Sequence, residues 1–385
     1  MRHGKNAIRY PLGSPSSLAV SREPGLGLGE LADFSAPGNP YFPTAELFDE
    51  LAGQLRALLR SHPGDPALVA DQLATVLKLN PRTLTVGNGT TELLTWIDHL
   101  LVDSSVAVPV PTSGRWIDQP LETGKRVDMF PLREAENFEL RVEAYVEFIR
   151  QRGSRAAVLC NPNNPDGGYL PRREVLRFMD QLADLDLVVI DESFIDFVEL
   201  ERNASVALEA TVRPNVIVVR SLGKTLGLNG VRLGYQVSNP ALSQKIGATL
   251  PKRNLNCLAE TIVFMLTEHW GEYAESLKLV VRDRFMMSAE LGRFPELTVY
   301  SSQASFLLIR LPPGVNCGEL AAYLLSEHNI LVRECGTRIG MTGGFIRVSV
   351  RPEDDVDLLV EGLRGFARSG SAVELVAQAD ERAFG

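Results

Sequence analysis

The segment Val216-Ile217-Val218-Val219-Arg220-Ser221-Leu222-Gly223-Lys224-Thr225-Leu226-Gly227 begins with four β-branched residues and ends in a glycine-punctuated turn that contains a lysine. A short apolar run bounded by turn residues is typical of a buried parallel strand. In a parallel sheet, the side chains that follow such strands gather at one edge. The segment therefore predicts an α/β fold in which Ser221 and Lys224 lie at the carboxyl end of a strand.

Ser221, Lys224 and the following Arg232 suit one particular chemistry. A lysine amine forms an imine with an aldehyde, and a hydroxyl and a guanidinium nearby can hold a phosphate. Together they predict a site for a phosphorylated aldehyde cofactor. The alternative interpretation is a solvated loop lysine, because a lone Ser-x-x-Lys pattern is weak evidence.

Further apolar runs alternate with helical stretches upstream of this segment. The predicted buried strands are Val106–Val110, Ala156–Leu159 and Leu187–Ile190, and the predicted helices between them are Glu143–Arg152 and Arg173–Ala183. This alternation is typical of a doubly wound α/β domain, which binds ligands beyond the carboxyl ends of its strands. Asn161, Asp191 and Ser221 each follow one of these strands, so we expect them at the binding edge.

The pattern changes after about residue 245. Two long helices, Leu255–His269 and Ala274–Leu291, are followed by predicted strands at Ser305–Leu311, Asn329–Glu334 and Gly344–Arg351. This order predicts a smaller α+β domain. We therefore expect an irregular N-terminal arm at residues 1–40, a large domain at 41–245, a small domain at 246–368 and a tail at 369–385.

Composition narrows the class of protein. The 385 residues are 45% hydrophobic and 23% charged, as in soluble globular proteins, and the net charge of −9 opposes nucleic acid or an anionic membrane as a partner. No apolar run is long enough to span a bilayer, and the N-terminus lacks the apolar core of a signal peptide. The four cysteines are scattered without metal-binding spacing, which favours a reducing cytoplasm and predicts no metal site.

Asp191 and Asn164 are candidate cofactor ligands. A carboxylate at position 191 can pair with a protonated pyridine nitrogen and so make the ring an electron sink. Asn164, in the turn Asn161-Pro162-Asn163-Asn164-Pro165-Asp166-Gly167-Gly168, can donate a hydrogen bond to a phenolate oxygen. The alternative interpretations are a helix N-cap for Asp191 and an ordinary tight turn around Asn164.

Anion-binding groups are predicted in both halves of the chain. Gly87-Asn88-Gly89-Thr90-Thr91-Glu92 precedes an apolar helix, and a glycine turn at a helix N-terminus offers backbone N–H groups to a phosphate. Arg347 and Arg333 lie in predicted strands and can grip carboxylates. The alternatives are a capped helix start and structural salt bridges.

In this order, the elements resemble the class I/II aminotransferase superfamily of fold-type I pyridoxal-phosphate (PLP) enzymes, over nearly the whole chain. Two groups are most similar, histidinol-phosphate aminotransferases and threonine-phosphate decarboxylases. The decarboxylase pattern is echoed by His3–Asn6, Asp33–Ser35, Asp191–Phe197 and Arg347–Arg351. The resemblance implies an aspartate aminotransferase-like fold, with PLP as cofactor and a homodimer that shares its active sites.

The resemblance also implies a role for each candidate residue. Lys224 is implied as the imine former, Asp191 as the partner of the pyridine nitrogen and Asn164 as the ligand of the phenolate. The implied phosphate ligands are Ser221, Arg232, Gly89, Thr90 and Thr91. The implied substrate-anion ligands are Arg347 and Arg333, with His3 and Asn6 from the arm.

Several positions depart from the superfamily pattern. Ser113 stands where relatives carry an aromatic residue stacked on the cofactor ring, so either Trp116 takes that role or the ring face is open. His62 stands where a tyrosine of the partner subunit usually reaches the phosphate. Phe194 replaces the tyrosine of most transaminases, as it does in the decarboxylase group. Asp166 replaces a usual threonine in the turn.

These departures leave the substrate open. The leading hypothesis is a PLP-dependent enzyme that acts on an amino acid with a second anionic group, most like threonine-phosphate decarboxylase. The alternatives are transamination of the histidinol-phosphate type and β- or γ-replacement, including carbon–carbon bond formation. A PLP-fold binding protein without chemistry is the non-enzymatic alternative.

Overall fold

The computed structural model describes residues 17–21 and 31–369, which form two compact units. The larger unit comprises residues 38–281 and 302–305, and the smaller unit holds the described parts of 1–37, 282–301 and 306–385. Helix α12 (Trp270–Leu291) contributes residues to both units. The larger unit therefore continues past residue 245 and includes α11 (Cys257–Met265). His3, Asn6 and residues 370–385 lie outside the described residues.

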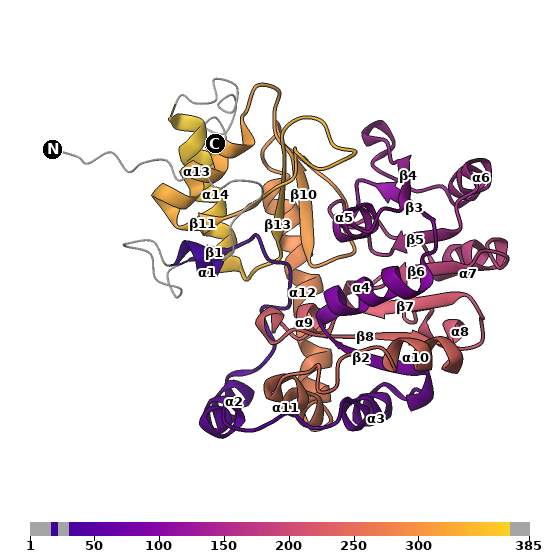
Figure 1. Cartoon of the computed structure of the whole chain (residues 1–385). Coiled ribbons are helices and arrows are strands. Elements are labelled where there is room, and N and C mark those ends of the chain that lie inside the picture. Colours follow the sequence, from indigo (N-terminus) through magenta and orange to yellow (C-terminus); the bar gives the residue numbers. More distant parts are fainter. Residues whose placement is uncertain (1–16, 22–30, 370–385) are drawn as a thin grey trace. The chain divides into compact units, whose positions relative to one another are not determined.

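A seven-stranded sheet forms the centre of the larger unit (Figure 1). Its strand order is β2 (Leu84–Asn88), β8 (Leu233–Ser238), β7 (Val216–Arg220), β6 (Leu187–Asp191), β5 (Ala156–Cys160), β3 (Ser105–Val110) and β4 (Arg126–Pro131). The five strands from β7 to β4 are parallel, whereas β8 is antiparallel to both of its neighbours. The predicted α/β fold with buried parallel strands is thus confirmed.

Helices cover both faces of this sheet. They are α2 (Ala45–Leu58), α3 (Pro66–Leu77), α4 (Gly89–Leu101), α5 (Arg115–Glu122), α6 (Val142–Arg152), α7 (Arg172–Gln181), α8 (Ala207–Ala210), α9 (Leu222–Thr225), α10 (Pro240–Gly247) and α11. Local signals set their ends. The Asp65 side chain accepts the Ala67 N–H at the start of α3, and Lys78 ends that helix in the left-handed conformation.

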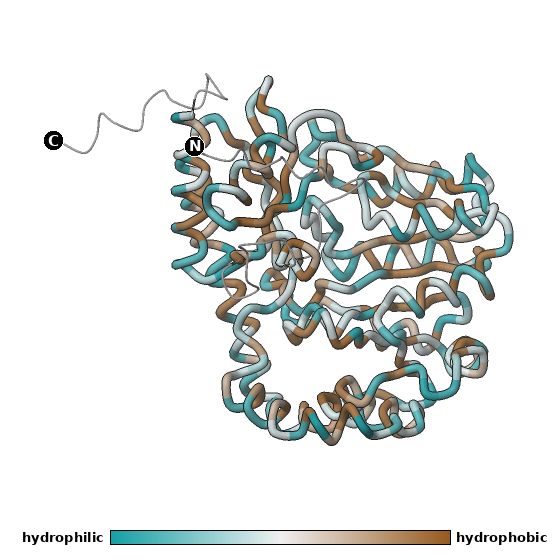
Figure 2. Tube along the Cα trace, turned by 60° about the vertical axis from the view of Figure 1, so that its left-hand side comes forward, coloured by the Kyte–Doolittle hydropathy of each residue, from teal (hydrophilic) through white to brown (hydrophobic). Residues whose placement is uncertain are grey.

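The core of the larger unit has two apolar layers, one on each face of the sheet. Along β6, Val188 and Ile190 pack into the layer that includes α6 and α7, while Leu187 and Val189 pack into the layer that includes α4 and α5. This alternation follows from the two-residue period of a strand. The central strands consequently appear as continuous hydrophobic segments, with hydrophilic residues on the outer helices (Figure 2).

The smaller unit is built on an antiparallel sheet. The strand order is β12 (Arg333–Glu334), β13 (Phe345–Ser349), β10 (Phe306–Arg310) and β9 (Thr298–Val299). A separate parallel pair joins β1 (Ala32–Asp33) to β11 (Ile330–Leu331), and the described helices are α1 (Ser17–Val20), α13 (Cys317–His328), α14 (Glu353–Arg368) and part of α12. The predicted strand 329–334 is therefore two short strands, because β11 pairs with β1 whereas β12 pairs with β13.

Two features are absent from the described residues, a membrane-spanning helix and a cluster of metal-binding side chains. None of the helices in residues 17–21 and 31–369 is both long and apolar enough to cross a membrane. Within the same ranges, no group of three or more His, Cys, Asp and Glu side chains is arranged to hold a metal ion.

Candidate active site

Three neighbouring strands bring the predicted cofactor residues to one edge of the sheet. Asn161 follows β5, Asp191 ends β6 and Ser221 follows β7, and β6 is hydrogen-bonded to both of the other strands. Because these strands are parallel, their carboxyl ends lie side by side. The structure therefore groups the residues that the strand pattern predicted to be together.

Lys224 lies in the short helix α9, directly after β7. Its Nζ atom is 4.1 Å from the centroid of the Phe194 ring, so an apolar aromatic face covers one side of the amine. The backbone of the same turn is held by Asn39, whose N–H donates to the Lys224 carbonyl at 3.0 Å. The Asn39 side-chain amide donates to the Thr225 carbonyl, also at 3.0 Å. The lysine thus extends from a backbone that is fixed on two sides.

Asn39 is a site residue that the sequence did not reveal, because we interpreted residues 1–40 as an irregular arm. It is buried, and its Nδ2 atom also donates to Ser276 Oγ at 2.8 Å. Gly227 ends the lysine turn at φ +66°, and an added Cβ would lie 2.2 Å from the Asn39 carbonyl oxygen. This close approach explains the glycine. No local pattern marks an asparagine whose side-chain partners lie 186 and 237 residues away in the sequence.

The Asp191 carboxylate is held by two neutral donors. The Trp116 indole N–H donates to Oδ2 at 2.7 Å, and the Ser193 backbone N–H donates to Oδ1 at 3.0 Å. Trp116 itself is only 3% exposed and packs in the apolar layer of α4 and α5. The indole therefore binds the Asp191 carboxylate through its N–H group, an arrangement that the sequence did not predict.

The adjacent Glu192 has a different environment. It is buried and forms an ion pair with Arg220 at 3.3 Å, and Arg220 also pairs with Asp196. Burial alone would lower the pKa of Arg220, but Asp196, Tyr235 and Glu192 raise it above its usual value. Glu192 further accepts the Val206 N–H. These charges neutralise one another and fix the segment that follows β6.

The turn after β5 is held together by its own polar side chains. Asn163 donates to the Pro111 carbonyl at 3.0 Å and to Asp166, and accepts a hydrogen bond from Thr112. Burial raises the pKa of Asp166 to about 6, although the Gly168 N–H and Asn163 oppose that shift. Asn164 lies next to this buried pair and is less buried than either residue. These hydrogen bonds therefore hold the backbone of Asn164 in a fixed position.

Residues Gly89, Thr90 and Thr91 form a cradle with Arg232. They open the 13-residue helix α4, whose N-cap Asn88 makes no side-chain capping bond. Gly89 has φ +73°, and an added Cβ would lie 2.6 Å from Arg232 Nη2. The same Nη2 lies 3.4 Å from Thr91 Oγ1. A helix N-terminus beside a guanidinium is a favourable place for a phosphate.

His62 lies apart from this cradle. It is exposed in the loop after α2 and lines a groove with α2 and α11. The neighbouring Gly64 N–H donates to Glu260 of α11 at 2.8 Å, which fixes the loop against that helix. Within the described chain, His62 and the α4 N-terminus therefore occupy separate regions of the larger unit.

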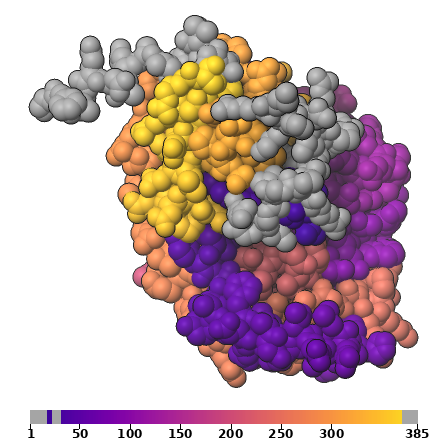
Figure 3. Space-filling model, turned by 90° about the vertical axis from the view of Figure 1, so that its left-hand side faces the viewer, coloured from indigo at the N-terminus to yellow at the C-terminus, as the bar shows by residue number. Residues whose placement is uncertain are grey.

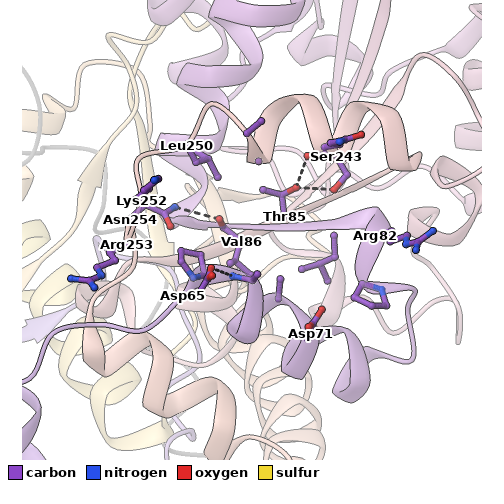
Figure 4. A pocket seen from close by; sticks show the side chains of 18 of the residues that line it. Asp65, Asp71, Arg82, Thr85, Val86, Ser243, Leu250, Lys252, Arg253 and Asn254 are labelled. Carbon is purple, nitrogen blue, oxygen red and sulfur yellow. Dashed lines mark hydrogen bonds between the residues drawn. The ribbon is translucent and has the colours of Figure 1, made fainter.

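A cavity of about 1150 Å³ opens beside the edge strand β2, between α3, α10 and residues 250–254 (Figure 4). Thr85 and Ser243 approach each other at 2.8 Å between their hydroxyl oxygens, and Asn254 donates to the Val86 carbonyl at 3.4 Å. None of the predicted cofactor residues lines this cavity. Its size therefore does not identify it as the site of the chemistry.

In the smaller unit, Arg333 and Arg347 lie directly opposite each other on β12 and β13. Arg347 is 4% exposed, donates to the Ser35 carbonyl at 2.8 Å and lies over the Phe306 ring at 5.1 Å. Burial lowers the pKa of Arg347 to about 9, and also lowers the pKa of Arg333. Like charges opposite each other destabilise a sheet, so the pair is unfavourable for the fold itself.

Comparison with known proteins identifies the family. The model of the family described as aminotransferase class I and II matches residues 42–363. The chain belongs to this family. Its members are PLP-dependent enzymes. PLP is a phosphorylated aldehyde, the kind of cofactor that the lysine segment predicted. The cradle at Gly89, the carboxylate at Asp191 and the amine of Lys224 offer the three kinds of ligand that PLP needs.

Individual relatives of this family member refine the comparison. The chain is 34% identical over 330 residues to the uncharacterized protein y4rO of Sinorhizobium fredii, covering 85% of this chain and 53% of that one. It is 30% identical over 322 residues to the L-serine phosphate decarboxylase of Sulfurospirillum multivorans, covering 81% of each chain. Histidinol-phosphate aminotransferases also match. The chain thus spans about half the length of the first of these relatives.

Solved structures support the same fold. A decarboxylase from Sulfurospirillum multivorans superposes with a TM-score of 0.78 at 27% identity, covering 87% of this chain and 88% of that one. The PLP-dependent aminotransferase fold predicted from the sequence is therefore confirmed.

Proposed function

We propose that the enzyme decarboxylates an amino acid that carries a phosphate or second carboxylate. The proposed substrate class is supported by the cross-strand pair of Arg333 and Arg347. Two like charges opposite each other destabilise the fold, and they suit the two anionic groups of such a substrate. The relative that decarboxylates L-serine phosphate supports the reaction. The Phe194 ring beside Lys224 also supports decarboxylation. The family resemblance of the sequence associates a phenylalanine at this position with the decarboxylase group.

The residues of the larger unit would bind and orient the cofactor. PLP, when bound, supplies an electron sink for the pair of electrons left at the substrate α-carbon. In our proposal, Arg232, Ser221 and the Gly89–Thr91 turn hold its phosphate, and Asn164 donates to its phenolate oxygen. Asp191 accepts the ring N–H, and Lys224 provides the amine that reacts with its aldehyde.

The remaining steps would fall to the substrate ligands and Lys224. Arg347 and Arg333 bind the substrate anions and so decide which bond at the α-carbon stands perpendicular to the cofactor ring. Loss of the carboxylate as carbon dioxide would leave an electron pair at the α-carbon, which the cofactor would stabilise. Lys224 would supply the proton that takes the place of the carboxylate, and its amine would then displace the product amine from the cofactor.

Transamination is the second candidate, because histidinol-phosphate aminotransferases are also among the relatives. The two reactions differ in which bond stands perpendicular, and thus in their products. Decarboxylation yields an amine and carbon dioxide, whereas transamination yields a carbonyl compound and transfers the amino group to a keto acid. β- or γ-Replacement would instead release the side-chain substituent.

The decisive experiment presents the holoenzyme with O-phosphoserine, O-phosphothreonine and histidinol phosphate, with and without 2-oxoglutarate. We expect carbon dioxide and an amine phosphate from an O-phosphoamino acid, without any need for the keto acid. The Lys224→Ala variant should fold but release no carbon dioxide. Keto-acid-dependent formation of a carbonyl product would favour transamination, and inorganic phosphate release would favour replacement.

We propose that the enzyme acts as a homodimer. Helix α2 buries Leu47 and Leu51. Phe48 and Leu55 of α2 and its C-cap residue Leu59 are exposed, so a second apolar face lies on the surface. The indigo-to-purple segment that includes α2 lies at the surface in Figure 3. Exposed apolar patches of this kind mark interfaces. A Leu59→Glu variant should shift the protein towards the monomer in light-scattering measurements. An unchanged mass would remove α2 from the interface.

We further propose a cytoplasmic location. The scattered cysteines of the sequence favour a reducing compartment, and all four lie within the described residues as free thiols. Fractionation of the native cells, with detection of the protein by antibody, tests this location.

A further inference from the structure

The Trp116–Asp191 contact is the polar link between α5 and the carboxyl end of β6. The indole N–H donates to Asp191 Oδ2 at 2.7 Å, within the usual range for a hydrogen bond to a charged acceptor. The indole is 3% exposed and packs among apolar side chains, including Val106 and Val189. It has little room to adopt another orientation, so the direction of this N–H is fixed by packing.

The second Asp191 oxygen is fixed as well. Oδ1 accepts the Ser193 backbone N–H at 3.0 Å, so the plane of the carboxylate is set by two donors on different elements. Both of these donors are uncharged. A neutral N–H donor stabilises a carboxylate over a carboxylic acid without cancelling its charge. The adjacent Glu192, by contrast, forms an ion pair with Arg220.

We propose that Trp116 is a positioning residue that holds the Asp191 carboxylate oriented towards the cofactor ring nitrogen. The proposal rests on the proposed function, in which Asp191 accepts the ring N–H of PLP. It replaces the stacking role that the sequence suggested for Trp116, because an indole that is buried and hydrogen-bonded through its edge serves the carboxylate. With Ser113 at the aromatic position, the ring face is then left to smaller side chains.

The negative charge of the Asp191 carboxylate sets the direction in which the Trp116 N–H affects the cofactor. The proton between Asp191 and the ring nitrogen can lie on either atom. The Trp116 N–H stabilises the charged carboxylate, so it favours the proton on the nitrogen and preserves the electron sink. A hydrogen bond to a charged group is worth enough to change this proton distribution by about tenfold to a hundredfold.

The test compares wild-type and Trp116→Phe holoenzymes reconstituted with PLP that is isotope-labelled at the ring nitrogen. Phenylalanine keeps an aromatic ring in the apolar layer but removes the N–H. We expect the nitrogen NMR signal of the variant to move towards that of an unprotonated ring nitrogen. The size of the change should correspond to the about tenfold to hundredfold change in proton distribution. The Trp116→His variant, which retains a ring N–H, should restore part of the wild-type signal. Trp96→Phe, on α4, is the matched control and should leave the signal unchanged.

The outcomes separate the two proposals. If the wild-type ring nitrogen is not protonated, Asp191 does not have its proposed role and the proposed function fails in that part. If the wild-type nitrogen is protonated and the Trp116→Phe signal is identical, the positioning role alone is overturned. A lower turnover with an unchanged nitrogen signal would indicate a packing role only, and would also overturn it.

A measurement on the unmodified side chain covers the case in which Trp116→Phe does not fold. The chain contains three tryptophans, so their indole N–H signals can be assigned individually by substitution of Trp96 and Trp270. We expect one signal to be shifted downfield and slow to exchange in the wild-type holoenzyme. That signal should move in the Asp191→Asn holoenzyme. If all three indole signals are the same in both proteins, Trp116 does not donate to Asp191 in solution.

Discussion

Arg220 in the larger unit and Arg347 in the smaller unit are both largely buried, yet their surroundings differ. Arg220 lies between Glu192 and Asp196, and these carboxylates raise its pKa despite burial. Arg347 lies over an aromatic ring and opposite another arginine, and burial lowers its pKa to about 9. The first arginine is paired with two carboxylates of the protein. The second faces a like charge across the sheet, and in our proposal it binds an anionic substrate.

The same distinction applies to two neighbouring acids. Glu192 has a cationic partner, whereas Asp191 is held by the neutral N–H groups of Trp116 and Ser193. In our proposal, the charged groups with an ionic partner in the protein stabilise the fold, and the others bind the cofactor or the substrate. A structural charge should affect stability when it is removed, and a ligand-binding charge should affect binding or rate.

The largest contrast is expected between Asp191→Asn and Glu192→Gln. Asp191→Asn should lower the turnover about a hundred- to a thousandfold, since loss of a buried charge partner costs about 3–5 kcal/mol. Its stability should stay near that of the wild type. Glu192→Gln should instead lower the free energy of unfolding by about 3 kcal/mol. Steady-state kinetics and urea denaturation of both variants provide the check. If the two variants have the same profile, the distinction between the neighbouring acids is wrong.

Arg220→Met and Arg347→Met form the matched pair for the arginines. Arg220→Met leaves the buried Glu192 and the half-buried Asp196 without their cation and should destabilise the protein by about 3–5 kcal/mol. Arg347→Met removes a like-charge contact and should leave stability unchanged or raise it, while substrate binding is lost. Urea denaturation measures the first effect, and titration calorimetry with the O-phosphoamino acid measures the second. A strong loss of stability in Arg347→Met would make that arginine a structural residue.

The sequence predicted those features that are encoded locally. Apolar runs located the parallel strands, and the residues after them located Asp191, Ser221 and Lys224. Long-range features were not predictable in this way. The indole of Trp116 reaches Asp191 only because α5 packs in the apolar layer that also contains Val189 of β6. Asn39 reaches the lysine turn across 186 residues of sequence.

The pairing register between strands is a second feature that a local sequence pattern does not predict. Alternating residues placed Arg347 and Arg333 in strands, but the pattern of one strand carries no information on which residue of another strand lies opposite. The direct pairing of these arginines is therefore a finding of the structure. The antiparallel β8 between β2 and β7 is another, since no strand was predicted at residues 233–238.

A smaller effect should separate Arg333 from Arg347. In our proposal, the two arginines serve two anionic groups of one substrate, and a buried guanidinium without its anion is costly. Arg333→Ala should weaken binding of O-phosphothreonine about tenfold to a hundredfold more than that of threonine. Arg347→Ala should weaken both ligands. Titration of each holoenzyme variant with each ligand measures this, and equal losses for both ligands in Arg333→Ala would contradict the proposed substrate class.

The last prediction concerns pH and Arg347 alone. Its folded pKa of about 9 lies well below the usual value for arginine, so the unfolded chain holds this proton more tightly than the folded protein does. The cost of burying the charge is therefore fully present below about pH 9, and declines as the pH rises from about 9 towards the usual arginine pKa. Substrate binding has the opposite dependence, because a carboxylate needs the charged guanidinium.

We therefore expect the affinity for a carboxylate substrate to fall by up to about tenfold for each pH unit above about 9. Over the same range, the stability advantage of Arg347→Met over the wild type should shrink. Binding titrations and urea denaturation of both proteins from about pH 7 to about pH 10 measure the two trends, and taking the difference between proteins cancels groups that titrate in both. If the substrate affinity of the wild type is constant across this range, Arg347 does not titrate there. Its burial would then be balanced within the fold, as that of Arg220 is.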